Sequence, residues 1–581
     1  MRLPLKEFRG ILATYLIPQL GSVLLLAILL LVSIALQLAN PQILRIFIDT
    51  ITAPGAHPYL TGIALLFIAG ALAQQGVMIA ATYVSERLGW LVTNALRADL
   101  ALHLVRMDMS FHKIYTPGAL IERVDGDVTA LANLFSQFVI QVLGNVLLLL
   151  GILVVLWTIN WQIGLALTLL VLVVLVVMIY VRSIAVPHWT AFRQVSADLF
   201  GFLEERFTGT EDIRSSGAQA YVLHRLYTYT RTRLQAARKA RLISSIPWSI
   251  PLVAATLGNI IAFILAASLY RAGAMTLGTA FLIYYYIQLM LQPLNLITNQ
   301  LDDFQKASAG LVRIREMLAI RSTLKDGPGV LFPAGGLSIE FDNVAFGYGD
   351  EEMVVQDLSF RVEAGSVLGL LGRTGSGKTT ITRLLFRLYD PAAGSIRLHG
   401  SNLREARRSD LRRHIGIVTQ DVQLFHATVR DNLTFFDSSI EDTRILQALS
   451  DLGLLPWYNR LADGLDTLLA AGGGGLSAGE AQLLAFARVF LRDPGVVILD
   501  EASSRLDPVT EHMIEHAIDK LLKGRTSIII AHRLGTIQRA DNILILENGR
   551  ISEKGSRVEL AADPESHFSH LLRTGYERVE A

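Results

Sequence analysis

Long stretches of the chain carry no ionised side chain, and they alternate with short, densely charged segments. The charge-free windows are residues 10–44, 50–85, 128–181, 242–270 and 272–301. A membrane-spanning helix needs about 20 predominantly apolar residues. The window 128–181 is long enough for two such helices joined by a tight turn at residues 159–161. The pattern therefore predicts six membrane helices rather than the core helices of a large soluble protein.

The connections between these segments indicate how the chain is oriented. The links 52–59 and 159–162 contain no Lys or Arg, whereas the long links after the second and fourth helices contain many. Basic residues favour the cytoplasmic side of a membrane. We therefore expect a multi-pass protein of the cell inner (plasma) membrane, with both termini and the long links in the cytoplasm.

The expected boundaries follow from the same pattern. We expect an amphipathic elbow helix at residues 1–15, lying along the membrane interface, and a membrane domain at residues 16–315. The six membrane helices are expected at about 17–51, 58–106, 128–158, 162–210, 242–270 and 276–318.

Beyond residue 301 the composition changes, because charged residues return. The Pro- and Gly-rich stretch at residues 325–336 is typical of a linker, which we place at 316–336. Short β-rich runs then alternate with helical ones. The β-rich runs lie at residues 338–344, 367–371, 496–499, 527–531 and 542–546. This alternation predicts a soluble α/β domain at residues 337–575.

The first chemical motif follows the apolar run 367–371. It matches G-x-x-x-x-G-K-[ST], and a helical segment follows it. Its glycines let backbone N–H groups surround a phosphate chain at a helix N-terminus. Lys378 is expected to reach the β- and γ-phosphates, and the Thr379 hydroxyl to ligate Mg²⁺. The expected ATP-binding residues of this loop are Gly372, Arg373, Thr374, Gly375, Ser376, Gly377, Lys378, Thr379 and Thr380.

The second motif is the apolar run 496–499 followed by the adjacent carboxylates Asp500 and Glu501. A buried parallel strand that ends in Asp can place this carboxylate beside a phosphate loop, where it holds Mg²⁺ through water. Glu501 can then orient or deprotonate the attacking water. On its own, the pair is equally typical of two solvated acids at a strand end. The fold class predicted by the whole pattern is a polytopic α-helical membrane domain, with six transmembrane helices and long cytoplasmic extensions, plus an α/β P-loop nucleotide-binding domain.

Composition narrows the chemistry. Of 581 residues, 52% are hydrophobic and only 18% are charged, which is unusual for a purely soluble protein. The 52 basic and 51 acidic side chains give a net charge of +1, so charge offers no support for nucleic-acid binding. The chain has no cysteine, which excludes disulfides, thiolate metal sites and cysteine nucleophiles.

A third motif, Leu476-Ser-Ala-Gly-Glu480, lies between the first two. The order of phosphate loop, Gln420, Leu-Ser-x-Gly, Asp500-Glu501 and His532 resembles an ATP-binding-cassette (ABC) nucleotide-binding domain. Because six membrane helices precede it, the whole chain resembles a half-transporter of the type I ABC exporter family.

The resemblance implies a role for each matching residue. Glu501, His532 and Gln420 match the catalytic positions, and Tyr348 matches the aromatic residue that stacks on adenine. It implies ATP and Mg²⁺ as cofactors, with Mg²⁺ held by Thr379, Gln420 and, through water, Asp500. The residues implied at the dimer interface are Ser477, Ala478, Gly479 and Glu480, which cap the ATP of the opposite subunit, and the crossing-loop residues Ser504 and Asp507.

The same resemblance implies a second half-transporter as partner, because two cassettes enclose two ATP molecules. The family prefers Gly and Gln where this chain has Ala478 and Glu480. This departure favours a heterodimer over a homodimer, since a carboxylate near the γ-phosphate weakens capping. The spans carry no charge in mid-membrane, which favours amphipathic drugs, lipids or apolar peptides as substrate. The alternative is a regulatory half that binds ATP while its partner does most of the hydrolysis.

Overall fold

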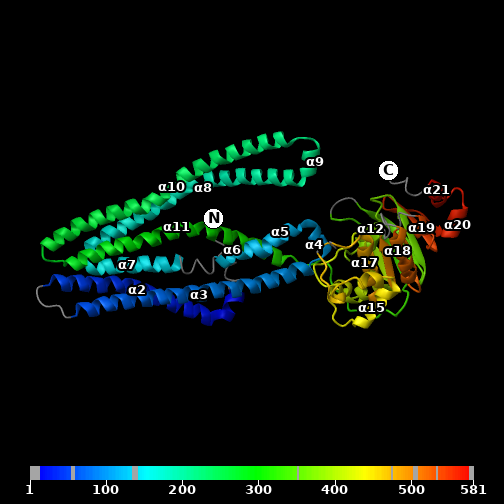
Figure 1. Ribbon diagram of the computed structural model, residues 1–581, viewed down its shortest axis with the longest axis horizontal. Helices are drawn as coiled ribbons and strands as arrows, with labels where there is room; N and C mark the ends of the chain where they lie inside the picture. The colour runs from blue at the N-terminus through cyan, green and yellow to red at the C-terminus, as the bar shows by residue number, and fades with distance from the viewer. Residues whose placement is uncertain are drawn as a thin grey trace. The chain divides into compact units, whose positions relative to one another are not determined.

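The computed structural model describes residues 13–53, 59–133, 142–349, 353–470, 472, 475–500, 508–530 and 534–574. The chain forms two compact units, and each is described by itself (Figure 1). The helical unit comprises residues 1–105 and 117–320, and the α/β unit comprises residues 106–116 and 321–581. The expected elbow helix at 1–15 lies almost wholly outside the described residues.

Long helices build the helical unit. They are α2 (Leu20–Thr52), α3 (Leu60–Arg106), α7 (Asn145–Ile159), α8 (Trp161–Thr208), α10 (Gln219–Arg271) and α11 (Leu277–Ala319). The short elements are η1 (Ile17–Gln19), α5 (Pro117–Ile121), η2 (Glu122–Asp127), α6 (Val128–Asn133) and α9 (Thr210–Ser215). The expected helix at 242–270 is the apolar second half of the much longer α10.

Five helices among the described residues are long and apolar enough to cross a membrane. They lie at Ala13–Thr52, Leu60–Arg106, Val142–Ile159, Trp161–Thr208 and Ser249–Arg271. The sixth expected segment, 276–318, forms α11 but is not one of these five.

The turn between α7 and α8 lies where the sequence predicted it. The Asn160 side chain caps α8 by accepting hydrogen bonds from the N–H groups of Gln162 (2.9 Å) and Ile163 (3.3 Å). Asn is a favoured N-cap residue because its short side chain reaches these otherwise unpaired donors. The two helices therefore run back along one another (Figure 1).

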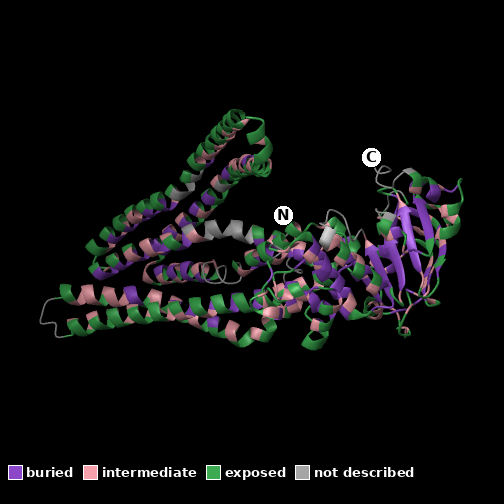
Figure 2. Cartoon of the chain, turned by 45° about the vertical axis from the view of Figure 1, so that its right-hand side comes forward, coloured by how far each residue is buried: buried purple, intermediate pink, exposed green. Residues whose placement is uncertain are grey.

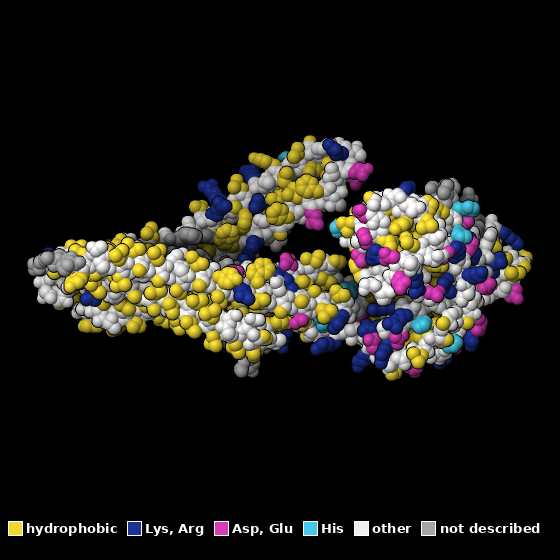
Figure 3. Space-filling view, turned by 60° about the horizontal axis from the view of Figure 1, so that its bottom comes forward, with side chains coloured by type: hydrophobic (Ala, Val, Ile, Leu, Met, Phe, Trp, Pro, Cys, Tyr) yellow, Lys and Arg dark blue, Asp and Glu magenta, His cyan; other side chains and the backbone are white. Residues whose placement is uncertain are grey.

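The helical unit exposes much of its apolar surface. Its small core lies between α7, α8, α10 and α11 and includes Ile152, Leu156 and Tyr286. Large apolar side chains face outward elsewhere, such as Leu72 (69% exposed) and Val176 (67% exposed). Figure 3 shows hydrophobic side chains covering the long helices. Contiguous apolar surface of this kind suits a lipid environment rather than water.

The α/β unit contains two sheets. The antiparallel sheet has the order β2-β1-β4-β5 and the larger one the order β10-β9-β3-β8-β7-β6, in which β9, β3, β8, β7 and β6 are parallel. The strands are β1 (Ile339–Phe346), β2 (Val355–Val362), β3 (Val367–Gly372), β4 (Ala393–Leu398), β5 (Ser401–Asn402), β6 (Ile415–Val418), β7 (Val496–Asp500), β8 (Thr526–Ile530), β9 (Asn542–Glu547) and β10 (Arg550–Ser556). The sequence predicted β1, β3, β7, β8 and β9 within a few residues.

Helices accompany these sheets. The unit contains α4 (Met109–Ile114), α12 (Lys378–Leu385), α13 (Arg408–His414), α14 (Val429–Thr434), α15 (Asp442–Asp451), α16 (Leu455–Tyr458), η4 (Gly464–Asp466), α17 (Ala478–Arg492), α18 (Pro508–Leu522), α19 (Leu534–Ile537), α20 (Arg557–Ala562) and α21 (His567–Thr574).

Both faces of the parallel sheet are buried. Alternate residues of each strand join different cores: Leu371 and Leu499 lie in one, and Leu370 and Ile498 in the other. Figure 2 shows these strands as continuously buried. A parallel sheet covered on both sides requires uninterrupted apolar runs, and this explains why the sequence shows runs rather than alternation.

Arg488 is a buried cation among the helices of this unit. Arg488 of α17 is 8% exposed and donates to the Asn432 carbonyl (2.7 Å), the Gln423 carbonyl (2.8 Å) and the Asn432 side-chain oxygen (3.1 Å). Its guanidinium also lies 4.7 Å from the Phe435 ring centre. Burial lowers the pKa of Arg488 to about 10, so it stays charged at neutral pH.

We expect Arg488→Met to reduce the free energy of unfolding of the α/β unit by about 2–3 kcal/mol, since three hydrogen bonds from a charged donor are lost. Arg492→Met is the matched control, because Arg492 is exposed and shares the Phe435 ring (5.1 Å). Chemical unfolding can be followed through Trp457, buried in the same core, after the other five Trp residues are changed to Phe. Equal losses for both variants would contradict the prediction.

Candidate nucleotide-binding site

The phosphate loop lies between the end of β3 and the start of α12. Gly372, Gly375 and Gly377 have φ angles of 146°, 83° and 106°, which side-chain-bearing residues rarely adopt. A Cβ on Gly372 would lie 2.3 Å from the carbonyl oxygen of Leu546. Glycine is therefore required here by both conformation and space, as the motif predicts.

The loop's polar groups fit a phosphate chain. Lys378 is 7% exposed, and its ammonium donates to the carbonyl oxygens of Gly372 and Arg373 (3.0 Å to the latter). The Ser376 hydroxyl oxygen is buried and makes no hydrogen bond to any described residue. A buried polar atom without a partner is costly unless a ligand supplies one. The amino end of α12 adds a favourable dipole for an anion.

The sheet register places Asp500 at the same edge of the sheet as the phosphate loop. Leu370 of β3 pairs with Ile530 of β8, and Ile530 pairs with Asp500 of β7. Carboxyl ends of parallel strands meet at the same edge of a sheet, so Asp500 and the phosphate loop share it. The chain continues from these strands to Glu501 and to His532, both of which lie outside the described residues, as do Ser504 and Asp507.

Groups suitable for Mg²⁺ are available at this edge. Asp500 ends β7, and the exposed Thr379 lies in the first turn of α12. Gln420 is exposed and follows β6, whose Val418 pairs with Leu499 of β7. The described residues hold no cluster of three acidic or histidine ligands. A magnesium ion bound through one carboxylate, a hydroxyl and phosphate oxygens needs no such cluster.

Tyr348 is held at the side of this loop by several contacts. Its hydroxyl bonds with the Thr380 hydroxyl (3.1 Å) and accepts from Arg383 (3.0 Å). Tyr389 packs edge-on against its ring, with centroids 5.2 Å apart. The Lys113 ammonium of α4 lies 4.7 Å from the Tyr348 ring centre. Tyr348 thus lies beside the loop with two basic neighbours, Lys113 and Arg383, that no spacing in the sequence indicated, and its stacking on adenine stays a prediction.

The third motif, Leu476–Glu480, which we call the signature segment, forms the amino end of α17. The Ser477 hydroxyl accepts from the Glu480 N–H (3.1 Å), and the Glu480 carboxylate accepts from the Ser477 N–H (2.9 Å). These reciprocal bonds form a capping box. Arg460 also donates to Glu480 (2.9 Å). The Glu480 carboxylate therefore caps the amino end of α17 and pairs with Arg460. The S-x-x-E spacing is the sequence signal for the capping role. Ala478 is exposed and Gly479 is buried.

Comparisons with known proteins agree with this arrangement. Residues 23–294 match the family described as "ABC transporter transmembrane region", and residues 355–504 match "ABC transporter". The chain is 30% identical to an uncharacterized ABC transporter ATP-binding protein of Bacillus subtilis, YfiC, over 97% of this chain and 94% of that protein. It is 33% identical to an ATP-dependent lipid A-core flippase of Photorhabdus laumondii, over 81% of each.

A solved structure is also similar. A bacterial Atm1-family ABC exporter with ATP bound superimposes with a TM-score of 0.80, at 25% identity, over 95% of this chain and 99% of that one. A polytopic helical domain joined to an α/β P-loop domain, the predicted fold class, is therefore confirmed.

The capping box gives a test of the signature segment. We expect Glu480→Ala to weaken the amino end of α17 by about 1 kcal/mol, because the reciprocal bond to Ser477 is lost. Glu480→Gln should preserve it, since an amide oxygen can accept the same bond. Amide hydrogen exchange in the first turn of α17 measures the difference, and Arg460→Ala controls for the ion pair alone. Equally fast exchange in both Glu480 variants would contradict this role.

Proposed function

The chain belongs to the ABC transporter family, and from this premise we propose that it works as one half of a dimeric exporter that moves amphipathic or hydrophobic molecules across the membrane. It is a multi-pass membrane protein and an ATP-hydrolysing ABC exporter. The observation that carries the proposal is the phosphate loop at the end of β3, with Lys378 and the unpartnered Ser376 hydroxyl, in the same chain as the long apolar helices.

Each residue of the site has a proposed task. The loop amides and Lys378 bind the β- and γ-phosphates, and Tyr348 packs against adenine. Thr379, Asp500 and Gln420 hold Mg²⁺, which neutralises charge on the phosphate oxygens when bound. Glu501 accepts a proton from the attacking water, and His532 donates a hydrogen bond to a γ-phosphate oxygen. Glu501 and His532 are assigned from the sequence alone.

The second subunit completes the site in this proposal. Ser477, Ala478, Gly479 and Glu480 start a helix, where N–H groups and a hydroxyl can bind phosphate. We propose that they cap ATP bound to the opposite subunit, with Ser504 and Asp507 at the same interface. Because Glu480 is engaged by Ser477 and Arg460, its charge is partly neutralised. This removes one reason for expecting a different chain as partner, while Ala478 still departs from the family pattern.

The substrate class rests on the surface of the membrane helices and on the relatives. The core between α7, α8, α10 and α11 is apolar, with the Tyr286 hydroxyl bonded to the Leu38 carbonyl (2.8 Å) and Gln42 (3.1 Å) as a local polar contact. Similar proteins include a lipid A-core flippase and a probable multidrug resistance transporter of Bacillus subtilis, 29% identical over 81% of this chain and 70% of that protein. We propose an amphipathic lipid or drug as substrate, and an inner-membrane location with the α/β unit in the cytoplasm.

Catalysis is tested with two variants of the full chain in lipid. We expect Glu501→Gln to lower ATP hydrolysis at least 100-fold while leaving ATP affinity within about twofold, because a base is lost and the phosphate contacts remain. Lys378→Ala should instead weaken ATP binding itself. Hydrolysis and fluorescent-nucleotide binding separate the two effects. Full turnover by Glu501→Gln would exclude Glu501 as the base.

The partner is tested by expressing this chain alone. If two copies complete each other's sites, we expect Mg²⁺-dependent ATP hydrolysis in reconstituted vesicles. Loss of this hydrolysis in Glu501→Gln would show that it comes from this chain. Retained ATP binding without hydrolysis would instead require a different chain to supply the capping segment. Size analysis of the purified protein in lipid nanodiscs distinguishes a dimer from a single copy.

A further inference from the structure

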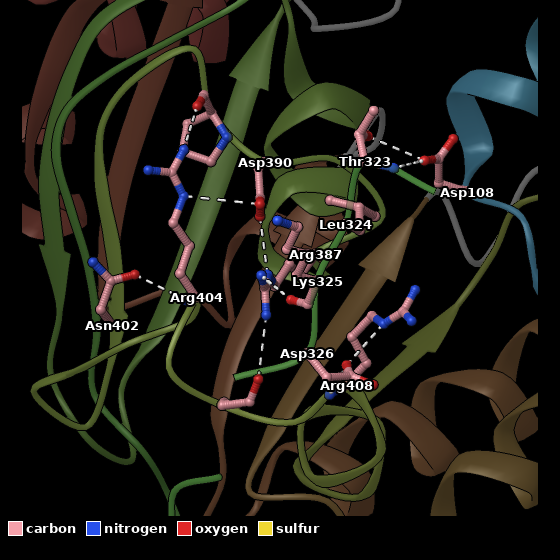
Figure 4. A network of polar contacts seen from close by, with 12 residues as sticks. Asp108, Thr323, Leu324, Lys325, Asp326, Arg387, Asp390, Asn402, Arg404 and Arg408 are labelled. Carbon is pink, nitrogen blue, oxygen red and sulfur yellow. Dashed lines mark hydrogen bonds and ion pairs between the residues drawn. The ribbon is translucent and has the colours of Figure 1, made fainter. Parts of the chain in front are cut away.

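The segment that follows α11 contacts α4 through one buried carboxylate. Asp108, at the amino end of α4, is 7% exposed. Its carboxylate accepts hydrogen bonds from the Phe111 N–H (3.1 Å), the Ser322 hydroxyl (3.0 Å), and the Thr323 N–H (2.8 Å) and hydroxyl (3.1 Å). One oxygen caps the helix while the other binds the linker, so Asp108 joins the two segments (Figure 4).

The charge of Asp108 is maintained by these donors. Burial raises the pKa of the Asp108 carboxyl, but the N–H groups of Thr323 and Phe111 and the two hydroxyls lower it more, so the net pKa lies below its usual range. The group is therefore ionised at cytoplasmic pH. Hydrogen bonds to a charged acceptor are the stronger kind, and four converge on this one side chain.

Two residues further along, the same linker is held by the phosphate-loop helix. Arg387 lies just after α12 and is 4% exposed, with a φ of 50° that turns the chain out of the helix. Its guanidinium donates to the carbonyls of Lys325 (2.8 Å) and Ala406 (3.2 Å) and pairs with Asp390 (2.9 Å). A left-handed conformation is uncommon for arginine, and here it directs the side chain to the linker (Figure 4).

Between these two contacts, and directly after them, the linker is packed against its surroundings. Leu324 is buried, at 8% exposed. The Gly327 backbone lies close to the loop between β5 and α13, and a Cβ on Gly327 would lie 2.2 Å from the Glu405 carbonyl oxygen. Asp326 pairs with Arg408 (2.9 Å), but both are partly exposed and neither reaches α4. The route from α12 to α4 therefore passes through Arg387, residues 322–325 and Asp108.

A separate contact also joins α4 to the nucleotide-binding residues. Lys113 lies over the ring of Tyr348, whose hydroxyl bonds with Thr380 of α12. Helix α4 is thus connected to α12 in two ways. Lys113 reaches Thr380 in the first turn of α12 through the Tyr348 ring, and Asp108 reaches Arg387, just after the last turn, through the linker.

We propose that Asp108 and Arg387 are positioning residues that clamp the linker between α12 and α4, so that nucleotide binding at the phosphate loop is transmitted to α4 within the same chain. The proposal rests on the proposed function, since it assumes that ATP binds at this loop. In this proposal, α12, the linker and α4 shift as one body when contacts with phosphate reposition α12. Breaking either end of the clamp should weaken the coupling of α4 to the loop, leaving only the contact of Lys113 with Tyr348, without preventing ATP binding.

Amide hydrogen exchange of the full chain in lipid nanodiscs, with and without Mg·ATP, tests this in a Glu501→Gln background that retains nucleotide. In the parent, ATP should slow exchange both in residues 375–385 and in α4, by roughly fivefold or more. In Asp108→Asn and in Arg387→Lys the slowing at the loop should persist, whereas that in α4 should fall below twofold. Asn retains the helix cap, so folding of α4 is preserved.

Asp326→Asn is the matched control, because it removes a carboxylate from the same linker without touching α4, and it should leave both effects intact. A double variant, Ser322→Ala with Thr323→Ala, removes donors from the linker side and should act like Asp108→Asn. The proposal is overturned if α4 responds to ATP in both clamp variants, if it never responds in the parent, or if Asp326→Asn has the same effect. Absence of any ATP effect at residues 375–385 in the parent would instead refute the proposed function.

Discussion

Nucleotide binding by the α/β unit depends on one junction, where the buried strand β3 ends and α12 begins. A strand covered on both faces cannot bend until it leaves the sheet. Gly372 is the last residue of β3, paired with Leu546 of β9, and the chain turns directly after it. The turn that follows presents one buried hydroxyl, that of Ser376, which has no partner among the described residues, at the amino end of α12. An anion is the natural partner for such a surface. The sheet's burial thereby decides where a nucleotide can bind.

Local patterns predicted this junction, because each signal is contained in a few consecutive residues. Apolar runs mark strands that are buried on both faces, and the spacing of glycines, Lys378 and Thr379 marks the loop. The start of α10 at Gln219 lies well before the expected bound of 242, which was drawn from apolarity alone, although long cytoplasmic extensions of the membrane helices were expected. Residues 219–241 continue the helix with Ala, Leu and Arg, which are good helix formers.

Other features were beyond the sequence because they join distant positions. Asp108 and Ser322 are 214 residues apart, and neither residue type signals the other. Lys113 over Tyr348 is equally invisible to spacing. Glu480 is different: its departure from the family pattern suggested interference with phosphate, whereas the S-x-x-E spacing already contained the explanation. Whether a charged side chain opposes or stabilises a site depends on the groups that it contacts, and the fold determines these contacts.

The way the linker is held has a consequence for its evolution. Arg387 contacts carbonyl oxygens of Lys325 and Ala406, which every residue type possesses. The exposed side chain of Lys325 is therefore free to change, whereas Ala406 is fully buried in the core. The number of residues between the two anchors is also fixed. Inserting or deleting one residue between Thr323 and Lys325 would move one attachment out of register. Natural relatives, and chimeras made by exchanging the α/β unit, should thus vary at residue 325 but keep an apolar residue at 324 and the segment's length.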